Sequence, residues 1–470
     1  MAKPLKLDSD RLFPIDSTVR AIARRLYESV KHTPIISPHG HTDPHWFASN
    51  ENFTDAVELL LAPDHYLYRM LYSQGIYIDD LCVPRHGKST QSDRRKAWRI
   101  FAENFYLFRA TPSSMWLNQV FFEVFGFKEQ LSKETADDYY DQINAHLKSD
   151  AFKPRALFER FNIALLSTTE GPTDRLVDHK AIRESGWAGR VIPTYRPDAV
   201  IDASHEDFDQ ALREFGELTG EDVYSWQGYL SAHRKRRAEF RAFGATATDH
   251  GHSTCRTANL DPKASENLYL RIVSKKASES DVELFQAQML TEMARMSLDD
   301  GMVMQIHPGA VRNHNHGLFL SHGRDKGADI PQATDYVHSL KPLLDAFGTE
   351  QSLSIILFTL DESTYARELA PLAGHYPALR LGPAWWFHDS PEGMYRFRRN
   401  TTETAGFYNT VGFNDDTRAF LSIPARHDMA RRVDAGYLAT LVADGRLSEE
   451  DAFEVIRDLT EKLPKAAYKL

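Results

Sequence analysis

Cysteine is scarce in this chain of 470 residues, which has only Cys82 and Cys255. Two thiols so far apart in sequence are too few for a disulfide framework and indicate reduced side chains. The sequence also has no run of 18 or more apolar residues, and its first residues lack the apolar segment of a signal peptide. We therefore expect a cytoplasmic protein that has no membrane partner.

Basic clusters and several catalytic motifs are missing as well. The chain has 56 Lys and Arg against 66 Asp and Glu, and no basic stripe that would neutralise phosphates, so nucleic acid is not an expected partner. The sequence has no G-x-G-x-x-G after a strand, no G-x-x-x-x-G-K-[ST], no G-x-S-x-G and no H-E-x-x-H. These absences disfavour dinucleotide chemistry, phosphoryl transfer and serine hydrolysis.

The chain does have a recurring pattern of a short apolar run, a polar or Gly/Pro-marked end, and a long amphipathic stretch. Eight strands alternating with helices predict an α/β fold, the (β/α)8 TIM-type barrel, whose site residues lie at the carboxyl ends of the strands. The eight predicted strands are Thr33–Ser37, Ile163–Ser167, Arg190–Thr194, Gly244–Thr248, Met302–His307, Leu353–Thr359, Leu379–Pro383 and Thr410–Phe413.

The connection after the first strand is too long to be a simple loop and predicts a helical insertion. Its expected helices are Asp93–Phe108, Ser114–Phe125 and Thr135–Leu147, the last opened by a capping box at Thr135-x-x-Asp138. We expect four segments: an N-terminal helix and first strand at 1–42, a helical cap at 43–160, the remaining barrel at 161–425, and C-terminal helices at 426–470. Ser448 is expected to begin a helix in the last segment.

His39-Gly40-His41 follows the first predicted strand. Alternate residues of an extended chain point to the same face, so the two imidazoles are placed to bind one divalent metal ion. Asp416 follows the eighth strand, the neighbour of the first in a closed barrel, and is the expected third ligand. Such a site leaves positions open for substrate oxygens. The alternatives are a surface pair of histidines, and a turn or helix-cap role for Asp416.

Arginines and tryptophans follow other strands. Arg196 and Arg312 are placed to clamp a carboxylate, and an extended backbone would put Arg418 on the same face as Asp416. Trp385 and Trp386 are expected to form an apolar or sugar-stacking wall. Ordinary ion pairs for the arginines, and packing under the cap for the tryptophans, are the alternatives.

Together these residues form a set of motifs that resembles the uronate isomerase (glucuronate isomerase) family, in family order along nearly the whole chain. The motifs are His39-Gly40-His41, Asp64-His65-Tyr66-Leu67-Tyr68-Arg69, Pro193-Thr194-Tyr195-Arg196-Pro197-Asp198, Asp249-His250-Gly251, Gln305-Ile306-His307-Pro308-Gly309-Ala310-Val311-Arg312-Asn313, Trp385-Trp386-Phe387 and Asp416-Thr417-Arg418-Ala419-Phe420-Leu421-Ser422.

The resemblance implies a distorted (β/α)8 barrel of the amidohydrolase superfamily. It implies an aldose–ketose isomerase of bacterial hexuronate breakdown, which interconverts D-glucuronate with D-fructuronate and D-galacturonate with D-tagaturonate through a cis-enediol. No organic cofactor is implied, but a divalent metal, often zinc, is. The implied roles are metal ligands for His39, His41 and Asp416, proton transfer by Asp416, oxyanion contacts for Arg418 and Tyr66, and substrate contacts for Arg196 and Arg312, with His65 nearby.

The chain departs from the family at two positions, with Leu441 where tryptophan is frequent and Tyr195 where Trp-Arg-Pro-Asp is common. The main alternative function is a metal-dependent hydrolase on the same barrel, for which His250 and His307 would be the additional ligands. A sugar-acid-binding protein without catalysis is a second alternative. A small hexuronate is the expected partner, and a homo-oligomer is compatible with the sequence.

Overall fold

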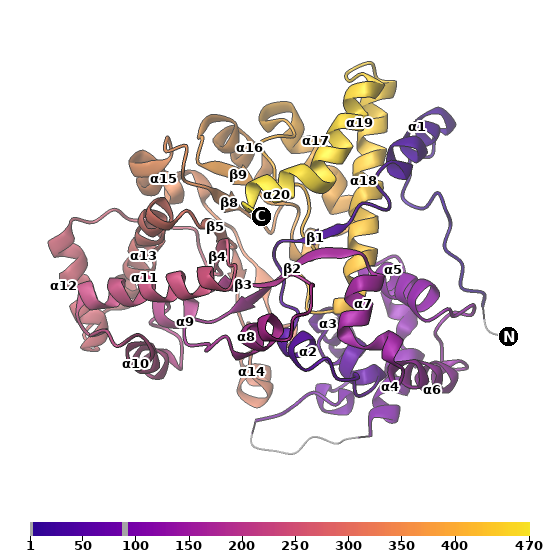
Figure 1. Ribbon diagram of the computed structural model, residues 1–470, viewed down its shortest axis with the longest axis horizontal. Coiled ribbons are helices and arrows are strands. Elements are labelled where there is room, and N and C mark those ends of the chain that lie inside the picture. The colour runs from indigo at the N-terminus through magenta and orange to yellow at the C-terminus, as the bar shows by residue number, and fades with distance from the viewer. Residues whose placement is uncertain (1–2, 87–92) are drawn as a thin grey trace.

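The computed structural model describes residues 3–86 and 93–470; residues 1–2 and 87–92, which fall within the predicted segments 1–42 and 43–160, lie outside it. Its core is a curled, all-parallel sheet of seven strands in the order β1-β2-β3-β4-β5-β8-β9, surrounded by helices (Figure 1). The strands are β1 (Ile35–Ser37), β2 (Ile163–Glu170), β3 (Val191–Tyr195), β4 (Ala247–His250), β5 (Val303–Ile306), β8 (Ile355–Leu357) and β9 (Leu379–Leu381). This architecture is consistent with a distorted TIM barrel.

The prediction of an eighth regular strand at Thr410–Phe413 is wrong. Thr410 forms only an isolated parallel bridge to Leu381 of β9. Seven residues after Thr410, the carbonyl of Thr417 accepts the backbone N–H of His41 at 3.0 Å. An irregular segment therefore spans from β9 to β1. The segment is irregular because its backbone turns at Gly412, which has a φ of 79°. A side chain at this position would put its Cβ 2.3 Å from the carbonyl oxygen of Leu459.

Helices fill the connection between β1 and β2. They are α2 (Pro44–Ser49), α3 (His65–Ser73), α4 (Arg94–Glu103), α5 (Pro112–Gln119), α6 (Ala136–Leu147) and α7 (Pro154–Arg160). Their buried aromatic side chains, among them Trp98, Phe101 and Phe158, form one hydrophobic cluster with Ile35 of β1. The predicted capping box at Thr135 is wrong, because the Thr135 hydroxyl donates to the Gln130 carbonyl at 2.9 Å and caps no helix.

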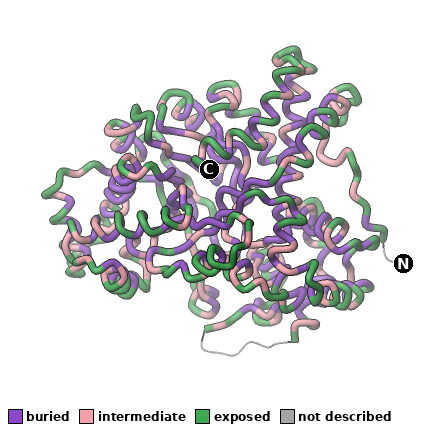
Figure 2. Tube along the Cα trace, viewed as in Figure 1, coloured by how far each residue is buried: buried purple, intermediate pink, exposed green. Residues whose placement is uncertain are grey.

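The remaining helices lie outside the sheet, and buried residues concentrate along the strands and the inner helix faces (Figure 2). A two-stranded antiparallel ribbon, β6 (Ala310–Val311) with β7 (Ile330–Pro331), follows β5. The helices are α1 (Ser17–Glu28), α8 (Val177–Glu184), α9 (Asp198–Ile201), α10 (Phe208–Thr219), α11 (Trp226–Ala242), α12 (Pro262–Val273), α13 (Glu279–Asp300), α14 (His316–His322), α15 (Tyr336–Phe347), α16 (Ala366–His375), α17 (Pro391–Ala405), α18 (Ile423–Ala443), α19 (Glu449–Arg457) and α20 (Leu463–Ala467).

The C-terminal residues return to the sheet. The helix start at Ser448 is confirmed, since its hydroxyl accepts the N–H of Asp451 at 3.0 Å. Tyr468, which follows α20, is fully buried. Its hydroxyl donates a hydrogen bond to Gln305 of β5 at 2.9 Å and accepts one from the side-chain amide of Asn414 at 3.0 Å. Among the described residues, no helix combines the length and apolar character that a membrane crossing requires.

Candidate active site

A cavity of about 820 Å³ lies where the strands end. It is lined by all ten residues that the sequence predicted for the site, so the fold brings together side chains that are up to 379 positions apart, from His39 to Arg418. These residues are His39, His41, His65, Tyr66, Arg196, Arg312, Trp385, Trp386, Asp416 and Arg418. His39, His41, Arg196, Trp385 and Trp386 converge because the parallel sheet puts every carboxyl strand end at one face. His65 and Tyr66 come from the start of α3, and Asp416 and Arg418 from the irregular segment after β9.

The two histidines of the first strand end meet Asp416. The Nε2 atoms of His39 and His41 lie 3.5 and 3.2 Å from Oδ1 of Asp416. Two ligands of a tetrahedral ion with bonds of about 2 Å are roughly 3.3 Å apart. Two imidazoles and one carboxylate at this spacing fit a divalent cation.

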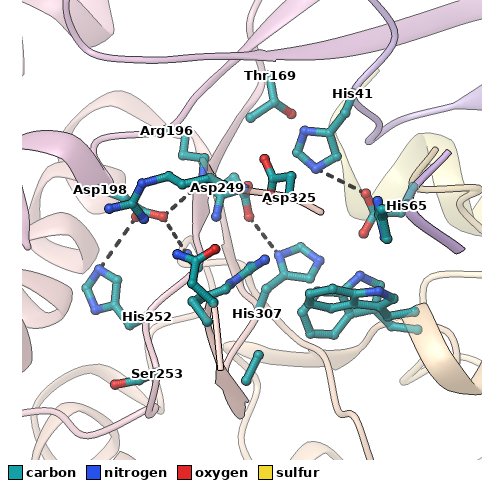
Figure 3. Close-up of a pocket in the computed structure, with 18 of the residues that line it drawn as sticks. His41, His65, Thr169, Arg196, Asp198, Asp249, His252, Ser253, His307 and Asp325 are labelled. Atoms are coloured by element: carbon teal, nitrogen blue, oxygen red, sulfur yellow. Dashed lines mark hydrogen bonds and ion pairs between the residues drawn. The ribbon is translucent and has the colours of Figure 1, made fainter. Parts of the chain in front are cut away.

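Asp249 and His307 extend this cluster. His307 Nδ1 and Asp249 Oδ1 are 2.7 Å apart (Figure 3). The His307 ring stacks on His39 at 4.8 Å between centroids. His307 Nε2 is buried and has no hydrogen-bond partner, so it is an additional candidate ligand. The sequence motifs included both residues, but they assigned no role to Asp249 and made His307 a metal ligand only under the hydrolase alternative.

The protonation states in this cluster favour cation binding. Burial lowers the pKa of His39 to about 4, so the imidazole is neutral at physiological pH. Burial alone would raise the pKa of Asp416, but the charge interaction with His39 and the hydrogen bond with His41 outweigh it and hold that pKa well below its usual range. A neutral imidazole and an ionised carboxylate are the forms that bind metal ions.

Each of the three predicted arginines is paired with a carboxylate. Arg196 Nε donates to Asp198 at 2.9 Å, and its Nη1 lies 3.1 Å from Asp249, so the guanidinium sits between two acids (Figure 3). In the other two pairs, the arginine nitrogen is 3.2 Å from the carboxylate for Arg312–Asp329 and 2.8 Å for Arg418–Asp325.

The expectation that Arg418 extends from the same face as Asp416 relied on an extended backbone. Asp416 instead has a φ of 37°, so the chain turns there, and Arg418 reaches Asp325 while still lining the cavity. The sequence did not reveal Asp325, because it lies in the β6–β7 connection outside every motif.

A second group missed by the sequence lies behind Tyr66. Asp389 accepts a hydrogen bond from Arg426 at 2.9 Å and a long one of 3.5 Å from the Tyr66 hydroxyl. The Arg426 guanidinium carbon is 3.6 Å from the ring centroid of Trp116. Burial raises the pKa of Asp389 to about 7 although Arg426 opposes the shift. Arg426 lies in the first turn of α18, within the predicted C-terminal helices. The spacing of apolar residues in that segment does not reveal that this turn reaches the site.

Four residues that line the cavity have left-handed backbone conformations. The φ angles are 52° at Asn313, 58° at Asp325, 52° at Trp386 and 37° at Asp416. This conformation is uncommon for residues other than glycine, and especially for a bulky tryptophan. Such strain persists where the surrounding structure enforces it and concentrates at functional sites.

Comparisons with known proteins agree with this site. The family model of glucuronate isomerase matches residues 16–466. A uronate isomerase of Phenylobacterium zucineum is 69% identical over 470 residues, which is 100% of this chain and 98% of the relative. The crystal structure of a glucuronate isomerase from Caulobacter crescentus superimposes with a TM-score of 0.98 at 63% identity, covering 99% of this chain and 98% of that chain.

A more distant relative has the same fold. The uronate isomerase structure from Thermotoga maritima gives a TM-score of 0.91 at 26% identity and covers 98% of this chain and 99% of that chain. These matches span the strands, the helices between them and all ten predicted site residues. The chain belongs to the glucuronate (uronate) isomerase family.

Proposed function

We propose that the protein interconverts D-glucuronate with D-fructuronate, and D-galacturonate with D-tagaturonate, by moving a proton between C2 and C1 through a cis-enediol. The observation that carries this proposal is the 69% identity over the full chain with a uronate isomerase. The cavity supports it, because a carboxylate, three arginines and a tyrosine line the same space.

Asp416 is the proposed base. It removes the proton from C2 of the open-chain aldose as the C1 carbonyl becomes an enediolate oxygen. O1 then gains a proton and the O2 hydroxyl loses one, and Asp416 returns its proton to C1 as the C2 carbonyl forms. Its low pKa keeps it ionised and ready to accept a proton. The same low pKa makes it a weak base toward carbon, so the reaction depends on stabilising the enediolate.

Arg418 and Tyr66 are the proposed partners of the developing oxyanion. Arg418 contributes a permanent positive charge, and burial raises the pKa of Tyr66 well above its usual value, so its hydroxyl keeps the proton it donates. Burial lowers the pKa of His65 to about 3, and its buried Nε2 lacks a protein partner, so a neutral His65 is available to hydrogen-bond the substrate.

The far carboxylate of the uronate is the proposed partner of Arg196 and Arg312. Both guanidinium groups line the cavity, and Arg312 lies over the Trp386 ring at 4.8 Å, which fixes its plane. Bidentate pairing at this end would hold the reacting carbons in place, and such positioning supplies much of the catalysis.

His39, His41 and Asp416 are the residues that would hold a divalent ion, with zinc as the proposed metal. When bound there, the ion supplies a Lewis acid that orients substrate oxygens. The helices of residues 43–160 supply His65 and Tyr66 from the start of α3, and we propose that this segment acts as a cap that excludes water from the enediolate.

The direct test incubates the protein with D-glucuronate and with D-galacturonate, with and without a chelator, while ketose is assayed. We expect a new ketose from each uronate and no cleavage product. A hydrolysis product from amide or ester substrates, with no ketose, would contradict the proposal and favour the metal-dependent hydrolase.

A further inference from the structure

The chain contains a second His-Gly-His sequence, His250-Gly251-His252, which the reaction described above does not use. It lies at the end of β4 (Ala247–His250), as His39-Gly40-His41 lies after β1. Asp198, which follows β3, completes the group: one ligand atom from each of Asp198, His250 and His252 lies within 4.8 Å of the other two. Two imidazoles and a carboxylate thus converge at a second pair of strand ends.

The atoms that face one another in this group have no partner in the protein. Nδ1 of His250, both ring nitrogens of His252 and Oδ1 of Asp198 are buried and form no hydrogen bond. His250 and His252 are themselves 0% and 7% exposed. The Nε2 of His252 is 3.7 Å from Asp198 Oδ1, too far for a hydrogen bond and close to the separation of two ligands on one ion.

The other atoms of two of these residues are held by the protein. His250 Nε2 lies 3.0 Å from the Thr248 hydroxyl, and Asp198 Oδ2 accepts from Arg196 at 2.9 Å and from the Gly251 N–H at 3.0 Å. Metal ligands are commonly oriented in this way by partners on their other atom. A Cβ at Gly251 would lie 2.0 Å from Arg196 Nη2, so a larger residue there would displace the Arg196 guanidinium.

We propose that Asp198, His250 and His252 form a second divalent-cation site, separate from the His39–His41–Asp416 cluster and suited to zinc. In the part of the chain that the structure describes, Arg196 is the one arginine or lysine paired with Asp198, and it also lies 3.1 Å from Asp249, so two carboxylates neutralise its charge. His252 lines the main cavity, as Figure 3 shows, so water or a substrate oxygen completes the coordination. The ion would fix Asp198 and, through it, Arg196. The proposal does not depend on the reaction assigned to the protein.

The test counts and locates bound zinc. The full-length protein is stripped with a chelator, reloaded with Zn²⁺, and its zinc content is measured by mass spectrometry, with circular dichroism to verify folding. We expect His252→Asn to lose one equivalent of zinc per chain relative to the unmodified protein. His205→Asn is the matched control, because His205 lines the same cavity outside the cluster, and it should lose none.

Anomalous scattering at the zinc edge then locates the ion in crystals of the unmodified protein, so the test does not depend on whether the variant folds. We expect a peak between Asp198 and His252. The proposal is overturned if zinc-soaked crystals show no peak there, or if a folded His252→Asn protein retains the full zinc content.

Discussion

At the scale of single residues, the carboxylate of Asp416 has no arginine as an ion-pair partner among the residues that the structure describes, because each predicted arginine of the site is paired with another acid. Asp416 faces two histidines, and its nearest arginine on the chain, Arg418, is paired with Asp325 at 2.8 Å. The Arg418 guanidinium is therefore held in place before substrate arrives. A pre-positioned charge stabilises a developing oxyanion without reorganising during the reaction.

Replacing this charge tests the role of Arg418. We expect Arg418→Met to lower kcat/KM for D-glucuronate by more than tenfold, a loss of over about 1.4 kcal/mol of transition-state stabilisation. Steady-state kinetics measure it, and Arg324→Met is the control, because Arg324 lines the same cavity but pairs with Glu206 at 3.8 Å. An Arg418→Met enzyme within tenfold of the unmodified protein would rule out the oxyanion role.

Asp389 should make stability depend on pH. Its folded pKa of about 7 lies above the ordinary value of 3.8, so the folded state binds more protons between those values and stability falls as pH rises through that window. Relative to Asp389→Asn, we expect the free energy of unfolding to decline from about pH 4 to about pH 7 and then to level off. Denaturant titrations of both proteins measure this difference. A difference that stays constant across the window would show that Asp389 is ionised throughout.

The ten predicted residues that line the cavity were predictable because each lies in a recognisable motif, although His65 and Tyr66 reach it from the start of α3 and not from a strand end. Asp325, Asp389 and Arg426 were not, for a physical reason. They reach the site from an irregular connection and a helix start, and the spacing of apolar residues carries no information on how such segments fold back.

At the scale of secondary structure elements, strand periodicity predicted all seven strands of the sheet, with ends shifted by a few residues, and an eighth strand that does not form. The fourth strand begins at Ala247 rather than Gly244, so Asp249 and His250 lie within it. The prediction of a strand at Thr410–Phe413 was wrong because contact with the C-terminal helices shapes the backbone there. The pattern of apolar residues along the chain could not reveal that Gly412 packs against Leu459.

Gly412 therefore tests the irregular segment. We expect Gly412→Ala to destabilise the protein by about 1–2 kcal/mol for the left-handed backbone and by roughly 1–3 kcal/mol more for the contact with the Leu459 carbonyl. Gly445→Ala is the control, because Gly445 has a φ of 71° and no atom within 4 Å of the added Cβ. Thermal unfolding compares the two, and equal losses would show that the Leu459 contact is unimportant.

At the scale of the whole molecule, the chain end is joined to the sheet that carries the site. Tyr468 hydrogen-bonds Gln305 and Asn414, both buried, and Gln305 Nε2 lies 3.3 Å from His39 Nδ1. We expect Tyr468→Phe to cost about 2 kcal/mol or more, because it leaves two buried polar groups without this partner. Tyr408→Phe is the control: Tyr408 is 51% exposed and its hydroxyl bonds Asp458, so its loss should cost less than about 1 kcal/mol. Losses of equal size would show that the chain end is not held by these bonds.

The most direct test of the whole scheme is the rate of ketose formation from D-glucuronate by the unmodified protein and by Asp416→Asn, with folding and zinc content measured for both. General acid–base groups contribute about 10²–10⁴ in rate, so we expect the unmodified protein to form ketose and Asp416→Asn to lose at least about 10²-fold in kcat. An Asp416→Asn protein that forms ketose at more than a tenth of the unmodified rate would show that another group moves the proton.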